Sequence, residues 1–211
     1  MKYILSLSFF ILFSVNAQDV APSWGNCLDG DVWFLTDISG SLEGQEPKIK
    51  SAIKLISERI LASNPNAMVG LLLFNTVINT KVELTNNVEE LGIDFTAIGG
   101  TDIFRALGDA VAYDQLKGRT GVNKIIILIS DGYDYFRDNP SILLGKAQTY
   151  KDLGYKIISI HFSDGLSAES FSNTANLMSK ISGEYASDQS FYYPVNLEGL
   201  AELFIRSFSC L

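Results

Sequence analysis

A chain of 211 residues, 47% of them hydrophobic, is long enough for one domain with a sizeable core and short for two. Its formal net charge of −8 argues against nucleic acid or anionic lipid as a partner, because both require a basic surface. Acidity alone identifies no positive partner.

The first residues have the pattern of a secretory signal peptide. Lys2 is a minimal basic start, an apolar stretch runs from Tyr3 to Val15, and small residues precede Gln18. We predict that residues 1–17 are removed and that the protein is secreted, or periplasmic or on the cell surface in a bacterium. The alternative is an N-terminal membrane anchor, although the stretch is short for a bilayer span of roughly 20 residues. No later segment is long and apolar enough to span a membrane.

Two cysteines flank the rest of the chain, whose single domain we place at residues 28–211. Cys27 lies just before the first predicted strand, and Cys210 is the penultimate residue. In an oxidising compartment an even pair is more often bridged than free, so the sequence predicts a disulfide that ties the ends of the domain together. Unpaired or intermolecular thiols are the alternative.

Four uninterrupted apolar runs predict strands that are buried on both faces of a parallel sheet. They are Val32–Leu35, Met68–Phe74, Ile125–Ile129 and Ile157–Ile160. One further segment differs, because Ile78, Val82 and Leu84 share one face of an alternating pattern after a short turn at Asn75–Thr76. This pattern is typical of an antiparallel edge strand in a hairpin.

Helical periodicity appears between and after these runs. One helix begins near Pro47 and ends near Ala62, a second ends before Gly154, and the clearest runs from Leu197 to Phe208. The apolar positions of the first two are Ile49, Ile53, Ile56 and Ile60, and Leu143, Ala147, Tyr150 and Leu153. Strands that alternate with helices predict a three-layer α/β domain with an open, mostly parallel sheet and one antiparallel edge strand.

Polar side chains follow the predicted strands at their carboxyl ends, where open α/β sheets bind ligands. They are Asp37, Ser39 and Ser41 after the first strand, Thr101 after "AIGG", and Asp131 after "KIIILIS". Hydroxyls and carboxylates without imidazole or thiolate suit Mg²⁺ or Mn²⁺ and disfavour zinc or copper. The alternative is local structure, in which the serines and the threonine cap helices and Asp131 with Gly132 forms an ordinary turn.

Asp-x-Ser-x-Ser, a Gly-Gly-Thr-Asp loop and Ser-Asp-Gly after a long apolar strand together resemble the von Willebrand factor type A domain, also seen as the integrin inserted domain. The resemblance covers nearly the whole chain after the signal peptide. It implies a Rossmann-like fold with a metal-ion-dependent adhesion site. The matching positions are Ser39, Ser41 and Thr101 as hydroxyl ligands, and Asp37 and Asp131 as aspartates that bind directly or through water.

The resemblance also implies a cell-adhesion or protein-binding module rather than an enzyme. The protein partner of such a module supplies an Asp or Glu carboxylate to the bound Mg²⁺ or Mn²⁺. In this family the last helix can shift and change affinity, and a bridge at Cys210 would restrain that shift. A metal-dependent hydrolase is a second interpretation, weakened because no general acid or base accompanies the site. A structural matrix or surface-fibre component with a vestigial site is a third.

Two further features have competing interpretations. The irregular segment "DGYDYFRDNP" carries binding-type side chains that we assign to the partner surface, although they can equally pack against the domain's own loops. These residues are Tyr133, Tyr135, Phe136 and Arg137. His161, the only histidine, ends an apolar run and is more typical of a packed or hydrogen-bonded residue than of a catalytic base.

Overall fold

The computed structural model describes residues 29–134, 139–162, 166–185, 189–190 and 192–195. In this part of the chain, six strands form an open sheet in the order β3-β2-β1-β4-β5-β8. The strands are β1 (Gly30–Asp37), β2 (Met68–Phe74), β3 (Ile78–Thr85), β4 (Asn123–Ser130), β5 (Tyr155–Phe162) and β8 (Tyr192–Val195). All neighbours are parallel except β2 and β3, which confirms the predicted fold class and its antiparallel edge strand.

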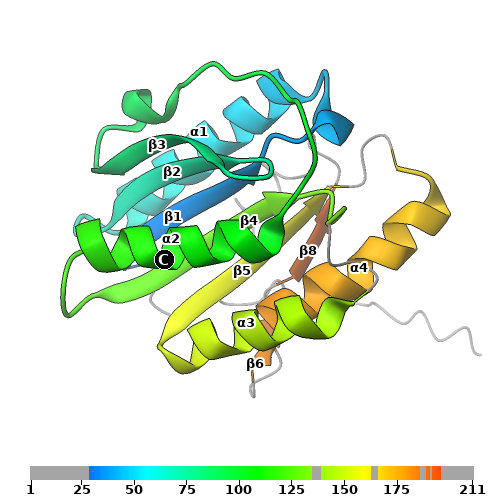
Figure 1. The fold of residues 1–211 in the computed structure, drawn as a ribbon. Helices are drawn as coiled ribbons and strands as arrows, with labels where there is room; N and C mark the ends of the chain where they lie inside the picture. The colour runs from blue at the N-terminus through cyan, green and yellow to red at the C-terminus, as the bar shows by residue number, and fades with distance from the viewer. Residues whose placement is uncertain (1–28, 135–138, 163–165, 186–188, 191, 196–211) are drawn as a thin grey trace, which may run out of the picture.

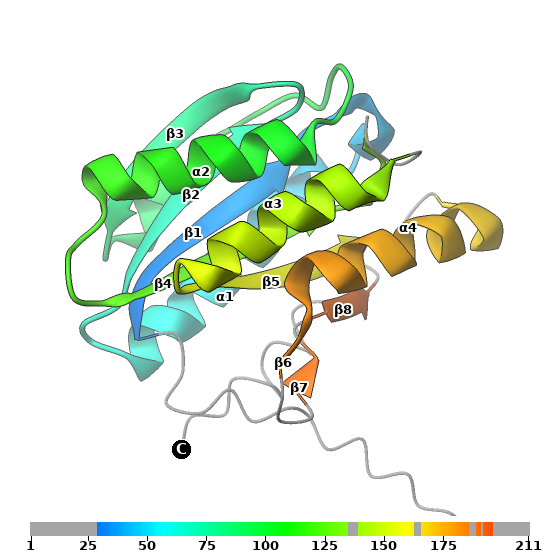
Figure 2. The same ribbon diagram turned by 60° about the horizontal axis from the view of Figure 1, so that its bottom comes forward.

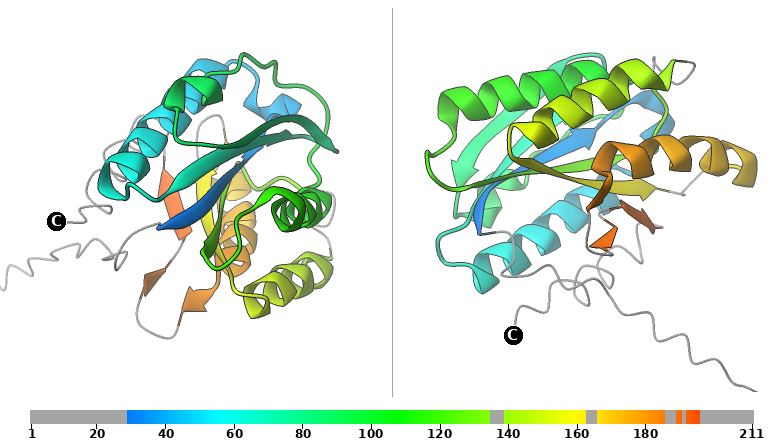
Figure 3. Two further views of the ribbon diagram at one scale, coloured as in Figure 1. Left: turned by 90° about the vertical axis from the view of Figure 1, so that its left-hand side faces the viewer. Right: turned by 90° about the horizontal axis from the view of Figure 1, so that it is seen from below.

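Helices cover both faces of this sheet, which gives the predicted three layers. Helix α1 (Glu46–Ser63) lies on one face, and α2 (Ile103–Lys117), α3 (Pro140–Asp152) and α4 (Ala168–Ser182) lie on the other (Figures 1 and 3). Figure 2 shows these last three helices arranged along their shared face. The other elements in the described residues are the short 3-10 helices η1 (Gly40–Leu42) and η2 (Val88–Leu91) and a small separate sheet of β6 (Glu184–Tyr185) and β7 (Gln189–Ser190).

Two apolar cores form because successive side chains of a strand point to opposite faces. In β1, Phe34 packs into the core beneath α1, whereas Trp33 packs into the core beneath the other three helices. Every residue of β1 is buried, which is the pattern expected of a central strand covered on both sides. None of the helices in the described residues combines the length and apolarity needed to cross a bilayer.

Helix α4 and strand β8 were absent from the sequence prediction. Signals for α4 are present, since Ser167 caps its start by accepting a 3.1 Å hydrogen bond from Ser170 N and Gly183 follows its end at φ 76°. The predicted helix from Leu197 to Phe208, both cysteines and residues 1–17 lie outside the described residues.

The arrangement that matters for the site is the parallel pairing of β1 with β4. Because the two strands run in the same direction, their carboxyl ends lie at the same edge of the sheet (Figure 1). Asp37 is the last residue of β1 and Asp131 directly follows β4, so two residues far apart in sequence lie at this edge.

Candidate metal centre

Backbone hydrogen bonds join the loop after β1 to the loop before α2. Ile98 N donates to Ile38 O at 2.8 Å, and Gly40 N donates to Gly99 O at 2.9 Å. Gly99 adopts φ 83°, a conformation that glycine tolerates best. Thr101 follows two residues later, so these bonds bring the threonine loop against the serine loop.

Asp37 is fully buried, and both of its carboxylate oxygens accept hydrogen bonds. Oδ1 accepts from Ser39 N at 2.8 Å, and Oδ2 accepts from the Ser130 hydroxyl at 2.7 Å. Burial and the nearby charge of Asp131 raise the pKa of Asp37 to about 7, although the hydrogen bonds from Ser130 and Ser39 oppose this rise. The ionised form of Asp37 is therefore costly in the metal-free protein.

Asp131 is also buried, but only one of its two carboxylate oxygens accepts a hydrogen bond in the described part of the chain. Its Oδ1 atom accepts from Tyr133 N at 3.1 Å, whereas Oδ2 has no hydrogen-bond partner in the described part of the chain. Burial raises the pKa of Asp131, and the nearby Ser41 hydroxyl and the Tyr133 amide partly oppose the rise. Among the described residues, no lysine or arginine contributes to the pKa shifts of Asp37 and Asp131.

The three hydroxyl residues are not used for helix capping in this structure. Ser39 occupies the N-cap position of η1 but makes no side-chain capping bond; its hydroxyl lies 3.1 Å from the Ser41 hydroxyl. The N-cap of α2 is Asp102, which accepts from Arg105 N at 2.7 Å, so the neighbouring Thr101 is not the cap. Local structure therefore accounts for the turn at Asp131, but helix capping does not account for the positions of Ser39 and Thr101.

The donor set fits a hard divalent cation. Among the described residues no three His, Cys, Asp or Glu side chains gather as a metal cluster, and this site holds two carboxylates beside hydroxyls. Such oxygen donors suit Mg²⁺ or Mn²⁺ better than zinc. A cation would offset the two buried charges and could engage the orphaned Oδ2 of Asp131.

Two supporting residues escaped the sequence analysis. Ser130 donates to Asp37, and Asp134, which is buried, accepts a 2.5 Å hydrogen bond from Ile103 N at the start of α2. Asp134 thereby fastens the loop after β4 to the helix that follows Thr101. The acidic side chain three residues beyond Asp131 was a visible signal for this contact.

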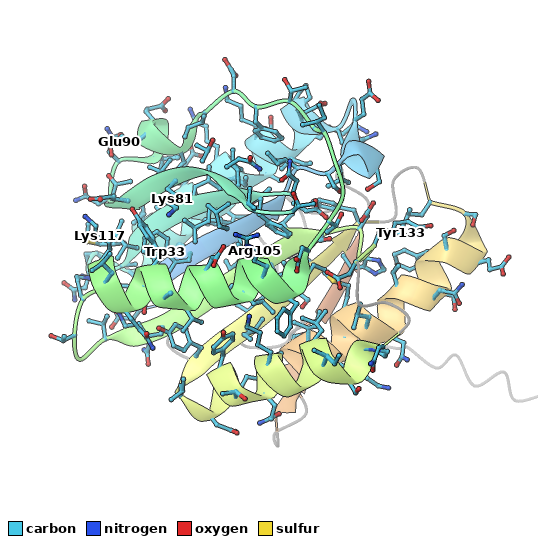
Figure 4. The ribbon with its side chains drawn as sticks, in the orientation of Figure 1. Trp33, Lys81, Glu90, Arg105, Lys117 and Tyr133 are labelled. Carbon is cyan, nitrogen blue, oxygen red and sulfur yellow. The ribbon has the colours of Figure 1, made fainter. Side chains whose placement is uncertain are left out.

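The predicted partner surface is described only in part. Tyr133 is half-buried and lies where the loop leaves the carboxyl end of β4 (Figure 4). Tyr135, Phe136 and Arg137 lie outside the described residues. The partner surface remains a prediction.

His161, at the end of β5, is fully buried and hydrogen-bonded, which confirms its interpretation as a packed residue. Its Nε2 atom lies 2.9 Å from the Asp131 carbonyl oxygen and 2.8 Å from the Thr174 hydroxyl oxygen. Burial lowers the pKa of His161 to about 4, so the imidazole is neutral at physiological pH.

Comparison with known proteins identifies one domain family. A family model described as von Willebrand factor type A domain matches residues 31–205. Among solved structures, the vWF domain of the type V pili tip protein Mfa5 from Porphyromonas gingivalis superimposes with a TM-score of 0.69 at 15% identity. That match covers 84% of this chain and 93% of the other. No curated protein matches the sequence.

Two longer proteins contain the same fold. The pilus adhesin SpaC from Lactobacillus rhamnosus GG gives a TM-score of 0.64 at 16% identity, over 90% of this chain but only 30% of the adhesin. Proximal thread matrix protein 1 from the mussel byssus gives 0.63 at 17% identity, over 84% of this chain and 44% of that protein. At these identities the likeness shows a shared fold.

Proposed function

Because this chain belongs to the von Willebrand factor type A domain family, we propose that it is an extracellular adhesion or protein-binding module with a divalent-cation site. The ligand set is Asp37, Ser39, Ser41, Thr101 and Asp131, and the ion is Mg²⁺ or Mn²⁺. The site acts by holding a partner protein and carries out no reaction of its own.

The observation that carries this proposal is the pair of buried carboxylates. The charge of Asp131 adds to the burial that raises the pKa of Asp37, and Asp131 Oδ2 has no partner in the described part of the chain. Unpaired buried charge is expensive and is usually retained where a ligand neutralises it. A hard cation at this position explains both features.

The proposed partner group is a carboxylate of Asp or Glu. Three of the five ligands are neutral hydroxyls, so the cation keeps most of its charge and attracts an anionic ligand. The chain's net charge of −8 repels an acidic partner at long range. Physiological salt screens that repulsion beyond a Debye length of about 8 Å, whereas the cation acts at contact.

The position of His161 disfavours the alternative of a hydrolase. The only histidine in the sequence is fully buried, and its Nε2 atom faces the Asp131 carbonyl oxygen. It is therefore unavailable as a general base. The pilus tip, pilus adhesin and thread matrix proteins that share the fold are consistent with an adhesive or structural role outside the cell.

Calorimetric titration with MnCl₂ and MgCl₂ tests the cation site directly. We expect one site in the wild-type protein and no binding in Asp37→Ala, with the fold of the variant retained by circular dichroism. Asp94→Asn is the matched control, because the Asp94 side chain is 96% exposed and pairs with Lys50. Unchanged Mn²⁺ binding in Asp37→Ala would contradict the assignment.

The carboxylate requirement needs a second experiment. Partners captured from the extracellular medium in Mn²⁺ are released with chelator, and each exposed acidic residue of an identified partner is changed to its amide. We expect one such change to weaken binding at least about tenfold. Chelator-sensitive binding that no single amide change weakens would show that another group reaches the cation.

A further inference from the structure

His161 connects helix α4 to the backbone of Asp131 in the candidate site. The imidazole Nε2 atom lies within hydrogen-bond distance of both the Asp131 carbonyl oxygen, at 2.9 Å, and the Thr174 hydroxyl oxygen, at 2.8 Å. Asp131 belongs to the loop after β4, His161 ends β5, and Thr174 lies in the middle of α4. One side chain thus joins three elements.

The direction of these bonds follows from the chemistry of the partners. A carbonyl oxygen can only accept, so the Nε2 atom of His161 carries the hydrogen. This single hydrogen is shared between the Asp131 carbonyl and the Thr174 hydroxyl, and the hydroxyl in turn donates to a carbonyl of its own helix, Ser170 O at 3.1 Å or Phe171 O at 3.3 Å. The chain of bonds runs from Asp131 to the backbone of α4.

The imidazole is fixed in place by a second contact with α4. Its ring stacks on Phe171 with a centroid distance of 4.4 Å and an angle of 4° between the planes. A stacked ring with a directed hydrogen bond has little freedom to rotate. The position of Nε2 therefore depends on where α4 lies.

The loop also touches α4 directly at Gly132. A Cβ atom there would lie 2.8 Å from Thr174 Cβ, 3.0 Å from Met178 Cγ and 3.3 Å from His161 Nε2. Gly132 has φ 80°, so the loop approaches the helix with bare backbone. The loop therefore packs closely against α4, and a shift away from the helix would lengthen the His161 bond to Asp131 O.

We propose that His161 and Thr174 form a link through which α4 positions the Asp131 backbone and thereby sets the cation affinity of the candidate site. His161 is a positioning residue, since it holds a ligand without contacting the cation. The inference rests on the proposed function and deepens it by naming a regulatory contact. A partner or segment that displaces α4 would therefore change the cation affinity of the candidate site.

Titration with MnCl₂ of three link variants tests the proposal. His161→Phe keeps an aromatic ring beside Phe171 but removes the donor, and Thr174→Val removes the hydroxyl at nearly constant shape. We expect each to weaken Mn²⁺ binding, His161→Phe by about tenfold or more, as is typical when a supporting hydrogen bond of a metal ligand is lost. His161→Gln, whose amide can place a donor near the former Nε2, should restore most of the affinity.

A control variant separates positioning from general loss of packing. Ser182→Ala removes a buried hydroxyl from the same helix, one whose hydrogen-bond partners among the described residues are both α4 carbonyls, Met178 O and Ser179 O. We expect it to change the midpoint of thermal unfolding without changing Mn²⁺ affinity. The same shift in affinity for Ser182→Ala as for Thr174→Val would overturn the link.

The outcomes distinguish this inference from the proposed function. Wild-type protein that binds no Mn²⁺ would overturn the cation site itself. Wild-type binding that persists within about twofold in folded His161→Phe and Thr174→Val would overturn the link alone. If His161→Phe does not fold, Thr174→Val decides the matter, because its smaller change leaves the imidazole in place.

Discussion

The Ser130 hydroxyl donates a 2.7 Å hydrogen bond to Asp37 Oδ2 and accepts a 3.0 Å bond from Gly132 N, so one side chain joins both aspartate-bearing loops. Ser130→Ala should destabilise the metal-free protein by about 1–3 kcal/mol, because a buried carboxylate and an amide both lose a partner. Urea unfolding at pH 8 with chelator measures the loss. Ser159→Ala is the control, since the Ser159 hydroxyl is buried without a partner in the described residues and its removal should cost less. Equal losses in both variants would contradict the prediction.

Replacement of Asp37 by Asn should remove one component of the pH dependence of stability. The pKa of Asp37 is about 7 in the folded protein against an ordinary value of 3.8, so between these values the folded state binds more protons than the unfolded state. The contribution of Asp37 to stability therefore falls as pH rises from about 4 to about 7, by up to about 1.4 kcal/mol per pH unit.

The Asp37→Asn comparison must be made as a difference, because His161 acts in the opposite sense. Its pKa is about 4 when folded against 6.5, so its contribution to stability rises over that interval. In chelator, the stability of Asp37→Asn relative to wild type should improve from pH 4 to pH 7 and then stay level. A difference that does not vary with pH would show that the carboxylate is not perturbed.

Asp114 should be a major contributor to stability at the end of the sheet remote from the candidate site. It is buried and accepts from Trp33 Nε1 at 2.8 Å, Tyr155 OH at 2.7 Å and Lys124 Nζ at 3.2 Å. Asp114→Ala leaves these donors unpaired and should cost about 3–5 kcal/mol, as for a broken buried ion pair. Asp109→Asn, at a largely exposed pair with Arg105, should cost less than about 1 kcal/mol. Urea unfolding followed by tryptophan fluorescence measures the stability of both variants. Similar losses in Asp114→Ala and Asp109→Asn would contradict the prediction.

Two glycine-to-alanine changes should have opposite effects on the stability of the fold. A Cβ at Gly70 in β2 would lie 2.5 Å from Trp33 Cε3, so Gly70→Ala overpacks the core and should destabilise by about 1–3 kcal/mol. A Cβ at Gly145 in α3 meets nothing within 4 Å, so Gly145→Ala should stabilise by up to about 1 kcal/mol through helix propensity. Thermal unfolding of the two variants compares them directly, and a shift of the same sign in both would count against the packing argument.

We predict that the protein is secreted, that its mature form begins near Gln18, and that it carries a bridge between Cys27 and Cys210. The even number of cysteines, which flank the domain, and the signal-like pattern of residues 1–17 are the basis for this expectation. Intact mass after alkylation without reductant checks both features. Two alkylated thiols on the secreted monomer would exclude the bridge.

The sequence alone determined the layers of the fold and the candidate ligands. Runs such as Met68–Phe74 indicate burial on both faces because solvent exposure would demand polar alternation, and that constraint is local to the strand. The spacing of Asp37, Ser39 and Ser41 is likewise local, so the resemblance could be read from the residues. The prediction failed for α4 although its cap and periodic apolar residues were present.

The groups that support the site could not be identified without the three-dimensional arrangement of the strands. Ser130 meets Asp37 across 93 positions because β1 and β4 are neighbouring parallel strands, and His161 meets Asp131 because β5 lies on the other side of β4. The same serine or histidine in another strand order would contact different groups. Periodicity records which side of an element is buried, whereas the identity of the contacting residue depends on strand order and register, which are set by the packing of the whole sheet.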